Sequence, residues 1–439
     1  MKWEKLLAPY RSGSKGSEIS KHRSTFEQDF DRIIFSFPFR KLQDKTQVFP
    51  LPEEDFVHTR LTHSLEVSSV GRSLGRIVGQ EIITKHPVLK SQNVSAHDFG
   101  VIVAAASLAH DIGNPPFGHS GEEAISEYFK SEKGGFFEEY VSRGEWRDLI
   151  NFEGNAQGFR LLNAKSLKLT YPVLGTFTKY PRISLLEKPD PNRRSQKKFG
   201  IYTSEFLIFN EIADQLGLIQ IGDGSWCRHP LSFLVEAADD ICYHIIDLED
   251  GCTLGLIDEE TTSKFLIEII GIEFDPEKYK QIPTKRERIG MLRAMAINKL
   301  VSQATQVFLS NEDDILTGKF DQSLIDMCES SATLKKIIDV SIDKLYRSRK
   351  VLEIEAAGFE VIAGLIDQFT KALHQVSYGN PTSREKALWH LLPEFYRVNS
   401  NKDSKYLMLR NCLDYISGMT DSYAISLYRK ITGMTHPGY

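Results

Sequence analysis

Residues 101–122 read VIVAAASLAHDIGNPPFGHSGE, an unbroken apolar run that ends in a histidine, an aspartate and a turn rich in glycine and proline. The apolar run is too short to span a bilayer, so it predicts a buried helix. Ser95-Ala96-His97-Asp98 has the form of a capping box that would begin this helix, and Gly113 marks its expected end. Ionisable side chains at the end of so apolar a helix are costly unless a partner compensates them, and a cation is the obvious candidate.

The rest of the chain also favours helices. Apolar residues three and four apart recur through most of the sequence, and strict alternation is scarce, so we expect an all-α fold. Ser120-Gly121-Glu122-Glu123 has the form of a second capping box, which would begin a helix after the rigid turn at residues 114–119. The stretch from Tyr180 to Gly200 is rich in proline, arginine and lysine and is expected to be a long loop.

The length of the chain and the positions of its glycine and proline residues suggest how it is organised. With 439 residues it exceeds one typical domain, and a weak break falls between Gly271 and Pro283. We expect a single large helical body over residues 1–439, with a catalytic core at 50–260 and a C-terminal helical portion at 280–439 packed on that core.

The composition excludes several classes of protein. The chain is 41% hydrophobic and 26% charged, as in ordinary globular proteins, and its formal net charge is −5, whereas a bulk nucleic-acid binder is usually basic. The five cysteines are scattered without CxxC spacing, which argues against disulfides and against a cysteine-ligated metal. Because neither a signal peptide nor a membrane-spanning run is recognisable, we expect a cytoplasmic protein with no membrane association.

His63 lies in the segment RLTHSLEV, residues 60–67, whose apolar positions predict an amphipathic helix with Arg60 and His63 on one face. A single histidine on such a helix is more often a hydrogen-bonded core residue than a ligand. His63 alone is therefore no evidence of a site, and the neighbouring pair His110 and Asp111 is ambiguous when taken alone.

A further helix is predicted between Pro230 and Asp250, where most positions are apolar. Asp239, Tyr243 and Asp247 are spaced four apart, so they project from one face of this helix. A polar stripe on a helix that otherwise looks buried needs a polar partner.

Three predicted helices thus supply two imidazoles and two carboxylates: His63, His110, Asp111 and Asp239. This mixed nitrogen and oxygen set suits Mn²⁺, Fe²⁺, Mg²⁺ or Ni²⁺, with coordination sites left for water and phosphate.

Long segments of the chain resemble the HD-domain deoxynucleoside triphosphate triphosphohydrolases, specifically the bacterial dGTPase-like family. The segments are RLTHSLEV (60–67), HDIGNPPFGHSGE (110–122), EAADDICYHIIDLED (236–250), FRKLQDKTQVFP (39–50) and DYISGMTDSYAISLYRKITG (414–433). The resemblance implies an HD-domain helical bundle core with additional C-terminal helices. It also implies hydrolysis of a deoxynucleoside triphosphate to a deoxynucleoside and tripolyphosphate, with Mn²⁺ or Mg²⁺ as the expected cofactor and Fe²⁺, Co²⁺ or Ni²⁺ as alternatives.

The resemblance also assigns roles to residues. It makes the same four side chains, His63, His110, Asp111 and Asp239, the metal ligands. His119 would act as the general acid for the leaving 5′ oxygen or manage the nucleophilic water, and Glu122 would orient its ring. Spacing does not divide these roles between His119 and Glu122.

Five residues are expected to contact the substrate. Arg60 and Lys179 resemble phosphate ligands of the family, with surface salt bridging as the alternative. Tyr243 and Asp247 are suited to packing on the deoxyribose and to accepting a hydrogen bond from its 3′ hydroxyl. Gln43 resembles a sugar-contacting residue of the family.

Two other functions stay open at the level of sequence: a phosphomonoesterase acting on deoxynucleoside monophosphates, and a non-catalytic sensor that binds nucleotide or single-stranded DNA. The expected partners are deoxynucleoside triphosphates and, by resemblance, further copies of the chain in a hexamer, with single-stranded DNA as another candidate. The basic side chains of the long loop are expected to be solvated, with contact to phosphate or single-stranded DNA as alternatives: Arg193, Arg194, Lys197 and Lys198.

Overall fold

The computed structural model describes residues 1–12, 23–48, 58–185, 189–397 and 404–434. Within these ranges the elements are helices apart from two short strands, which confirms the predicted all-α fold. Residue 50, the expected start of the catalytic core, and residues 186–188 of the expected loop lie outside the described residues. Among the helices of the described ranges, none is both long and apolar enough to cross a membrane.

The elements of the first part of the chain are α1 (Trp3–Leu6), α2 (Thr25–Ile34), α3 (Phe37–Arg40), the 3₁₀ helix η1 (Lys41–Asp44), α4 (Arg60–Lys85), α5 (Val88–Ser91), α6 (Ala96–Ala109), α7 (Gly118–Lys130), α8 (Glu132–Gly135), η2 (Glu138–Tyr140), α9 (Arg143–Ile150), α10 (Gly154–Leu162) and α11 (Tyr171–Phe177).

The later elements are η3 (Arg194–Gln196), η4 (Thr203–Glu205), α12 (Phe206–Leu216), β1 (Gln220–Gly222), β2 (Ser225–Trp226), α13 (Ser232–Thr253), α14 (Glu259–Ile270), η5 (Gly271–Glu273), α15 (Pro276–Lys280), α16 (Lys285–Ser310), α17 (Glu312–Leu316), η6 (Ile325–Met327), α18 (Ser331–Ser341), the π-helix η7 (Ile342–Tyr346), α19 (Arg349–Tyr378), α20 (Ser383–Leu391), η8 (Glu394–Tyr396), α21 (Lys405–Ser417) and α22 (Asp421–Thr432). Strands β1 and β2 pair antiparallel.

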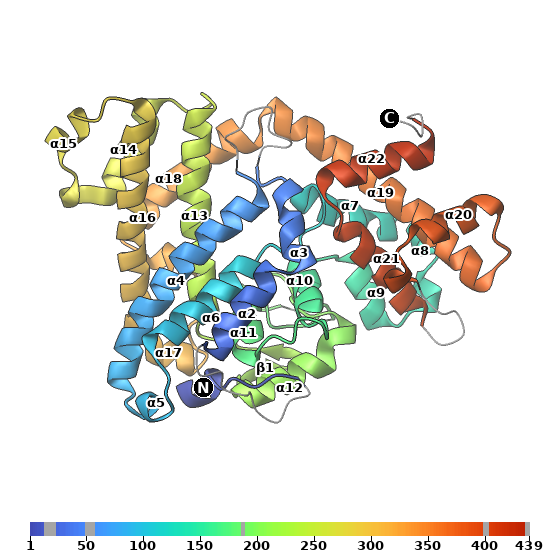
Figure 1. Cartoon of the computed structure of the whole chain (residues 1–439), viewed down its shortest axis with the longest axis horizontal. Coiled ribbons are helices and arrows are strands. Elements are labelled where there is room, and N and C mark those ends of the chain that lie inside the picture. The colour runs from blue at the N-terminus through green and yellow to red at the C-terminus, as the bar shows by residue number, and fades with distance from the viewer. Residues whose placement is uncertain (13–22, 49–57, 186–188, 398–403, 435–439) are drawn as a thin grey trace.

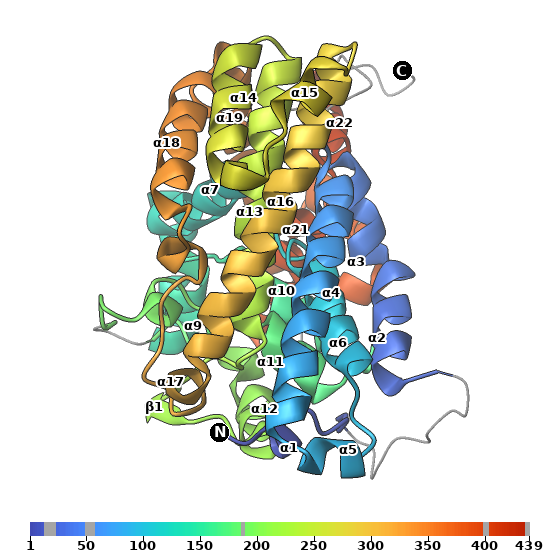
Figure 2. The same cartoon turned by 90° about the vertical axis from the view of Figure 1, so that its left-hand side faces the viewer.

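Two hydrophobic cores organise the helices. The first is built by α4, α6, α13 and α16 together with the short N-terminal helices, and its long helices run side by side in both views (Figures 1 and 2). The second joins α7 and α9 to the C-terminal helices α19–α22, on the right of Figure 1. Helix α7 therefore packs with the C-terminal part of the chain. Helices α4, α6 and α13, in contrast, pack together in the first core.

Close packing of α4 on α6 depends on glycines. Gly71, Gly75 and Gly79 follow one another at four-residue intervals, so they form a smooth stripe on α4. A Cβ at Gly75 would lie 2.7 Å from the Phe99 carbonyl oxygen, and a Cβ at Gly79 would lie 2.7 Å from the Phe99 Cβ. Gly71 faces Ser107, so the helices are antiparallel, and the start of α4 meets the end of α6.

The first predicted capping box is confirmed: the Ser95 side chain accepts from the Asp98 N–H, and Asp98 accepts from the Ser95 N–H. Helix α6 ends at Ala109, four residues before the expected Gly113, with His110 as its C-cap.

The second predicted capping box, at Ser120–Glu123, is wrong. Helix α7 begins at Gly118, so Ser120 lies inside its first turn, and the N-cap residue is Phe117 in a left-handed conformation with φ of 63°. The Phe117 N–H donates to the Asp421 carboxylate at 3.1 Å, a partner that no local sequence pattern could indicate.

In its described part, the stretch from Tyr180 to Gly200 contains no α-helix, as predicted for a long loop. Isolated bridges between Arg182 and Ser225 and between Ile183 and Ile201 hold it against the body.

Candidate active site

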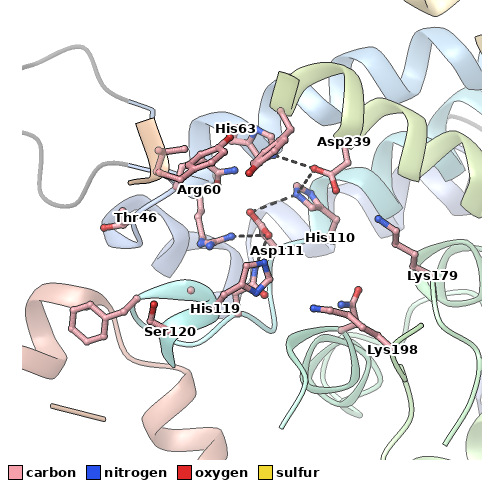
Figure 3. Close-up of a pocket in the computed structure, with 18 of the residues that line it drawn as sticks. Thr46, Arg60, His63, His110, Asp111, His119, Ser120, Lys179, Lys198 and Asp239 are labelled. Carbon is pink, nitrogen blue, oxygen red and sulfur yellow. Dashed lines mark hydrogen bonds and ion pairs between the residues drawn. The ribbon is translucent and has the colours of Figure 1, made fainter. Parts of the chain in front are cut away.

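Three of the predicted metal ligands meet in space. His63 comes from the first turn of α4, His110 caps α6, and Asp239 lies in α13. The Nε2 atoms of His63 and His110 lie 3.3 and 3.6 Å from Asp239 Oδ1, and one ligand atom from each residue lies within 4.8 Å of the others. The three side chains point toward one another in Figure 3. The antiparallel packing of α4 on α6 explains why the two imidazoles, far apart in sequence, become neighbours.

Asp111 lies beside this cluster. Its Oδ1 forms an ion pair with Arg60 Nη1 at 2.9 Å, and its Oδ2 lies 3.5 Å from His110 Nε2. Burial raises the pKa of the Asp111 carboxyl, but the charges of Arg60 and the two histidines outweigh burial and leave it below its usual value. Within the described structure Oδ2 is buried with no hydrogen-bond partner.

These observations fit a divalent cation. An orphaned carboxylate oxygen costs free energy when it is buried, and a cation held between it and the imidazoles would remove that cost. The pKa of Asp239 is also lowered: burial raises it, but His110, His63 and Lys179 more than compensate, so Asp239 is anionic as a ligand must be. The donor set of two nitrogens and two carboxylates is of the kind used for first-row transition metals.

His119 and Glu122 form a hydrogen-bonded pair at the edge of the cluster. His119 Nδ1 lies 2.8 Å from Glu122 Oε2, and the imidazole is 83% exposed whereas the carboxyl is 10% exposed. Glu122 also accepts from the Gly154 N–H at 2.7 Å and lies 4.0 Å from Lys198 Nζ. Although burial raises the pKa of Glu122, His119 and Lys198 lower it overall, so the carboxylate is held ionised behind the imidazole.

The cluster opens into a cavity of about 530 Å³. Arg60, Lys179 and Lys198 line it, and Lys179 and Lys198 lie on the same side of the ligand cluster in Figure 3. Lys179 Nζ lies 3.4 Å from the buried Glu236, and although burial lowers the pKa of this lysine, Glu236 raises it overall, so its charge is retained. From the sequence we expected Lys198 to be a solvated loop residue, but in the structure it lines the cavity.

The polar stripe of α13 is divided between different surroundings. Tyr243 lines the cavity, where its ring stacks on Tyr346 at 5.8 Å and 16°. Asp247 is buried and is not among the residues that line the cavity; its carboxylate accepts from the Tyr346 hydroxyl at 2.6 Å. Burial raises the pKa of Asp247 to about 8.

The structure does not bring Gln43 to the cavity. Gln43 is exposed in η1. Gln47, four residues further along the chain, lines the cavity, and its Oε1 is buried without a hydrogen-bond partner. Both glutamines fall in one segment of the family resemblance, and nothing in their local sequence separates them.

One wall of the cavity was not predicted from the sequence. Tyr346, Val351, Ile354 and Glu355 line it from the π-helix η7 and the start of α19. Because these residues are about 100 positions beyond Asp239 and carry no motif, only the folded chain places them.

Comparison with known proteins identifies relatives along the full chain. Residues 60–146 match the HD domain family, and residues 325–430 match the phosphohydrolase-associated domain. A deoxyguanosinetriphosphate triphosphohydrolase-like protein of Synechocystis sp. is 42% identical over 99% of this chain and 100% of its own length. One of Pseudomonas aeruginosa is 37% identical over 100% of both chains, and a deoxyguanosinetriphosphate triphosphohydrolase of Yersinia enterocolitica is 29% identical over 96% of each.

Proposed function

The chain belongs to the HD-domain family of deoxyguanosinetriphosphate triphosphohydrolase-like proteins, and on that premise we propose that it hydrolyses deoxynucleoside triphosphates to deoxynucleoside and tripolyphosphate. One observation carries the proposal: His63, His110 and Asp239 meet beside the orphaned Oδ2 of Asp111, at the wall of a cavity that also contains basic side chains. A cavity of about 530 Å³ is within the range that small-molecule sites use.

The four residues His63, His110, Asp111 and Asp239 would hold a divalent ion, with Mn²⁺ or Mg²⁺ expected first. When bound, the ion would neutralise charge on the α-phosphate and lower the pKa of water beside it. Arg60, Lys179 and Lys198 would bind the remaining phosphate oxygens, since their positive charges converge on the cavity from different elements.

In the proposed reaction, water oxygen attacks the α-phosphorus, and the bond from phosphorus to the 5′ oxygen breaks. The water oxygen keeps one proton and stays on the tripolyphosphate, and its other proton is released to solvent. The 5′ oxygen is the leaving group and needs a proton. We assign the delivery of that proton to His119 Nε2, because Nδ1 of the same ring is held by Glu122. Glu122 would stabilise the protonated ring and fix its orientation.

The wall formed by Tyr243 and Tyr346 would receive the sugar. The stacked rings provide a flat apolar surface, and Tyr243 lies one helical turn from Asp239, so a deoxyribose attached to the α-phosphate would reach it. In the described structure Asp247 supports Tyr346, so its proposed contact with the 3′ hydroxyl would require that hydrogen bond to be exchanged.

The proposal is tested by incubating the purified chain and Mn²⁺ with the four dNTPs, the matching NTPs and the monophosphates, with products resolved by chromatography. We expect a deoxynucleoside and tripolyphosphate in equal amounts. Orthophosphate from dGMP, with dGTP untouched, would instead identify a phosphomonoesterase. Nucleotide binding without any turnover would identify a sensor and overturn the proposal.

A further inference from the structure

The junction between α21 and α22, residues 417–422, contacts two segments from the N-terminal half of the chain. Lys41 Nζ donates to the Gly418 carbonyl at 2.6 Å, and Lys45 Nζ donates to the Ser417 carbonyl at 2.8 Å. Lys45 also donates to the carbonyl of Asn114 at 2.5 Å and is only 3% exposed. The junction therefore lies against the segment after α3 and against the turn that follows the metal ligands.

Asp421, the first residue of α22, is the acidic centre of this junction. It is 2% exposed, and each of its carboxylate oxygens accepts from a backbone N–H: Thr46 at 2.9 Å and Phe117 at 3.1 Å. Neither N–H belongs to the C-terminal part of the chain. One carboxylate thus fixes two backbone segments that are separated by about 70 residues.

Both segments carry residues of the cavity. Thr46 is followed by Gln47, which lines the cavity, and Thr46 also bridges to Thr59, the N-cap of α4. Phe117 is followed by Gly118 and then His119 at the start of α7. The two hydrogen bonds of Asp421 therefore hold the backbone segments that precede α4 and α7.

Phe117 needs such support because its backbone is left-handed, with φ of 63°, a conformation that is unfavourable for a residue with a Cβ atom. Its ring is held by the same C-terminal part of the chain. A Cβ at Gly358 in α19 would lie 2.8 Å from the Phe117 Cγ, so the ring packs directly on the glycine. The N–H and the ring of Phe117 are thus fixed independently, by Asp421 and by Gly358.

We infer that Asp421 is a positioning residue for the reaction: by holding the Phe117 N–H, it sets the start of α7 and therefore the place of His119 relative to the metal ligands. The inference rests on the proposed function. It gives the C-terminal part of the chain, from which no proposed metal ligand comes, a defined contribution to catalysis. Asp421 itself lines no part of the cavity, so it acts through the backbone and not on the substrate.

The test compares Asp421→Ala and Asp421→Asn with the matched control Ser422→Ala. Ser422 belongs to the same junction, but its hydroxyl donates to Asp44 at 2.9 Å, whereas the N–H groups of Thr46 and Phe117 donate to Asp421. For Asp421→Ala we expect kcat for dNTP to fall at least tenfold, while KM and the Mn²⁺ affinity measured by titration stay within twofold. Asp421→Asn keeps one carbonyl acceptor and should lose less activity, and the control should match the wild type.

Hydrogen exchange read by mass spectrometry supplies a measurement that does not depend on turnover. In Asp421→Ala, amides of residues 114–122 should exchange faster than in the wild type and the control, with exchange in α6 unchanged. If Asp421→Ala does not fold, Asp421→Asn, which loses one of the two acceptors, should show a smaller fall in kcat with unchanged KM and faster exchange of the same amides.

The outcomes separate the two proposals. A wild-type chain that leaves every dNTP intact contradicts the proposed function, and the exchange measurement then still decides whether Asp421 fixes the start of α7. An active wild type with unchanged kcat in Asp421→Ala overturns the positioning role. If Asp421→Ala lowers kcat and also changes KM and the Mn²⁺ affinity by more than twofold, the loss is a general structural one. That outcome would also overturn the positioning role.

Discussion

At the scale of single residues, the site concentrates charge that the fold would not otherwise tolerate. Asp111 and Asp239 keep lowered pKa values in spite of burial because Arg60, Lys179 and the two histidines surround them. The orphaned Asp111 Oδ2 shows that this balance is incomplete in the protein alone. This open oxygen belongs to an anionic carboxylate beside two imidazoles, which suits it to a cation.

His119→Ala should reduce kcat by about 10²–10⁴-fold, the range expected when a general acid is removed. The bound Mn²⁺ per chain should not change, because His119 is not one of the four proposed metal ligands. Steady-state kinetics and elemental analysis of the same preparation give both values. His97→Ala is the matched control, since His97 is an exposed histidine paired with Glu27 outside the cavity. Turnover equal to wild type in His119→Ala would remove this histidine from the mechanism.

At the scale of elements, the sequence predicts helices well where a periodic pattern and its own cap are both local. Helix α6 begins as its capping box predicts, and the Asp239 helix, predicted between Pro230 and Asp250, runs from Ser232 to Thr253. The start of α7 is mispredicted because the group that determines it, Asp421, is about 300 residues away.

The same distinction applies to the candidate site. The meeting of His63, His110 and Asp239 could be expected because each belongs to a segment with a recognisable motif. Glu355 and Tyr346 could not be expected, since their place in the cavity depends on how α19 and η7 pack. The surroundings of Asp247 could not be predicted either, because its hydrogen-bond partner, Tyr346, lies 99 residues further along the chain.

His58 links two elements of the site and should make stability depend on pH. Its Nδ1 lies 2.9 Å from Asp250 at the end of α13, and its Nε2 lies 3.3 Å from Glu66 in α4. Burial lowers the pKa of His58, but hydrogen bonds from the protonated ring to Asp250 and Glu66 raise it to about 10. The resulting stabilisation is complete below pH 6.5, the unperturbed value, and is lost as the pH rises from 6.5 toward 10.

His58→Ala should therefore lower the free energy of unfolding by about 1.5–3 kcal/mol at pH 6, the range for hydrogen bonds to charged groups. The difference from the wild type should shrink steadily up to pH 10. Thermal unfolding scans at six pH values measure this trend, with His97→Ala as the exposed-histidine control. A difference that is constant across the pH range would show that His58 contributes by packing alone.

At the scale of the whole molecule, the candidate site lies where the two hydrophobic cores meet. The metal-ligand helices α4, α6 and α13 belong to the first core, whereas α7, which carries His119 and Glu122, packs in the second with α19. The cavity is lined from both sides. Any process that shifts one core against the other would separate the metal ligands from the proposed acid, so the contacts of Asp421 and Lys45 across this boundary matter for activity.

Metal binding should accordingly stabilise the entire fold, because it joins three helices of the first core at one point. A ligand present at 100 times its Kd stabilises the folded state by about 2.7 kcal/mol, which for a chain of this length corresponds to a rise in Tm of about 3 °C. We expect Mn²⁺ to raise the Tm of the chelator-treated protein by this amount, and chelator to reverse the rise. Asp239→Asn and Asp111→Asn should abolish the response, since each removes a proposed ligand charge, whereas Asp339→Asn, at an exposed position of α18, should retain it. An equal response in Asp239→Asn would mean that the ion stabilises the protein from another place, and the assignment of the four ligands would then be wrong.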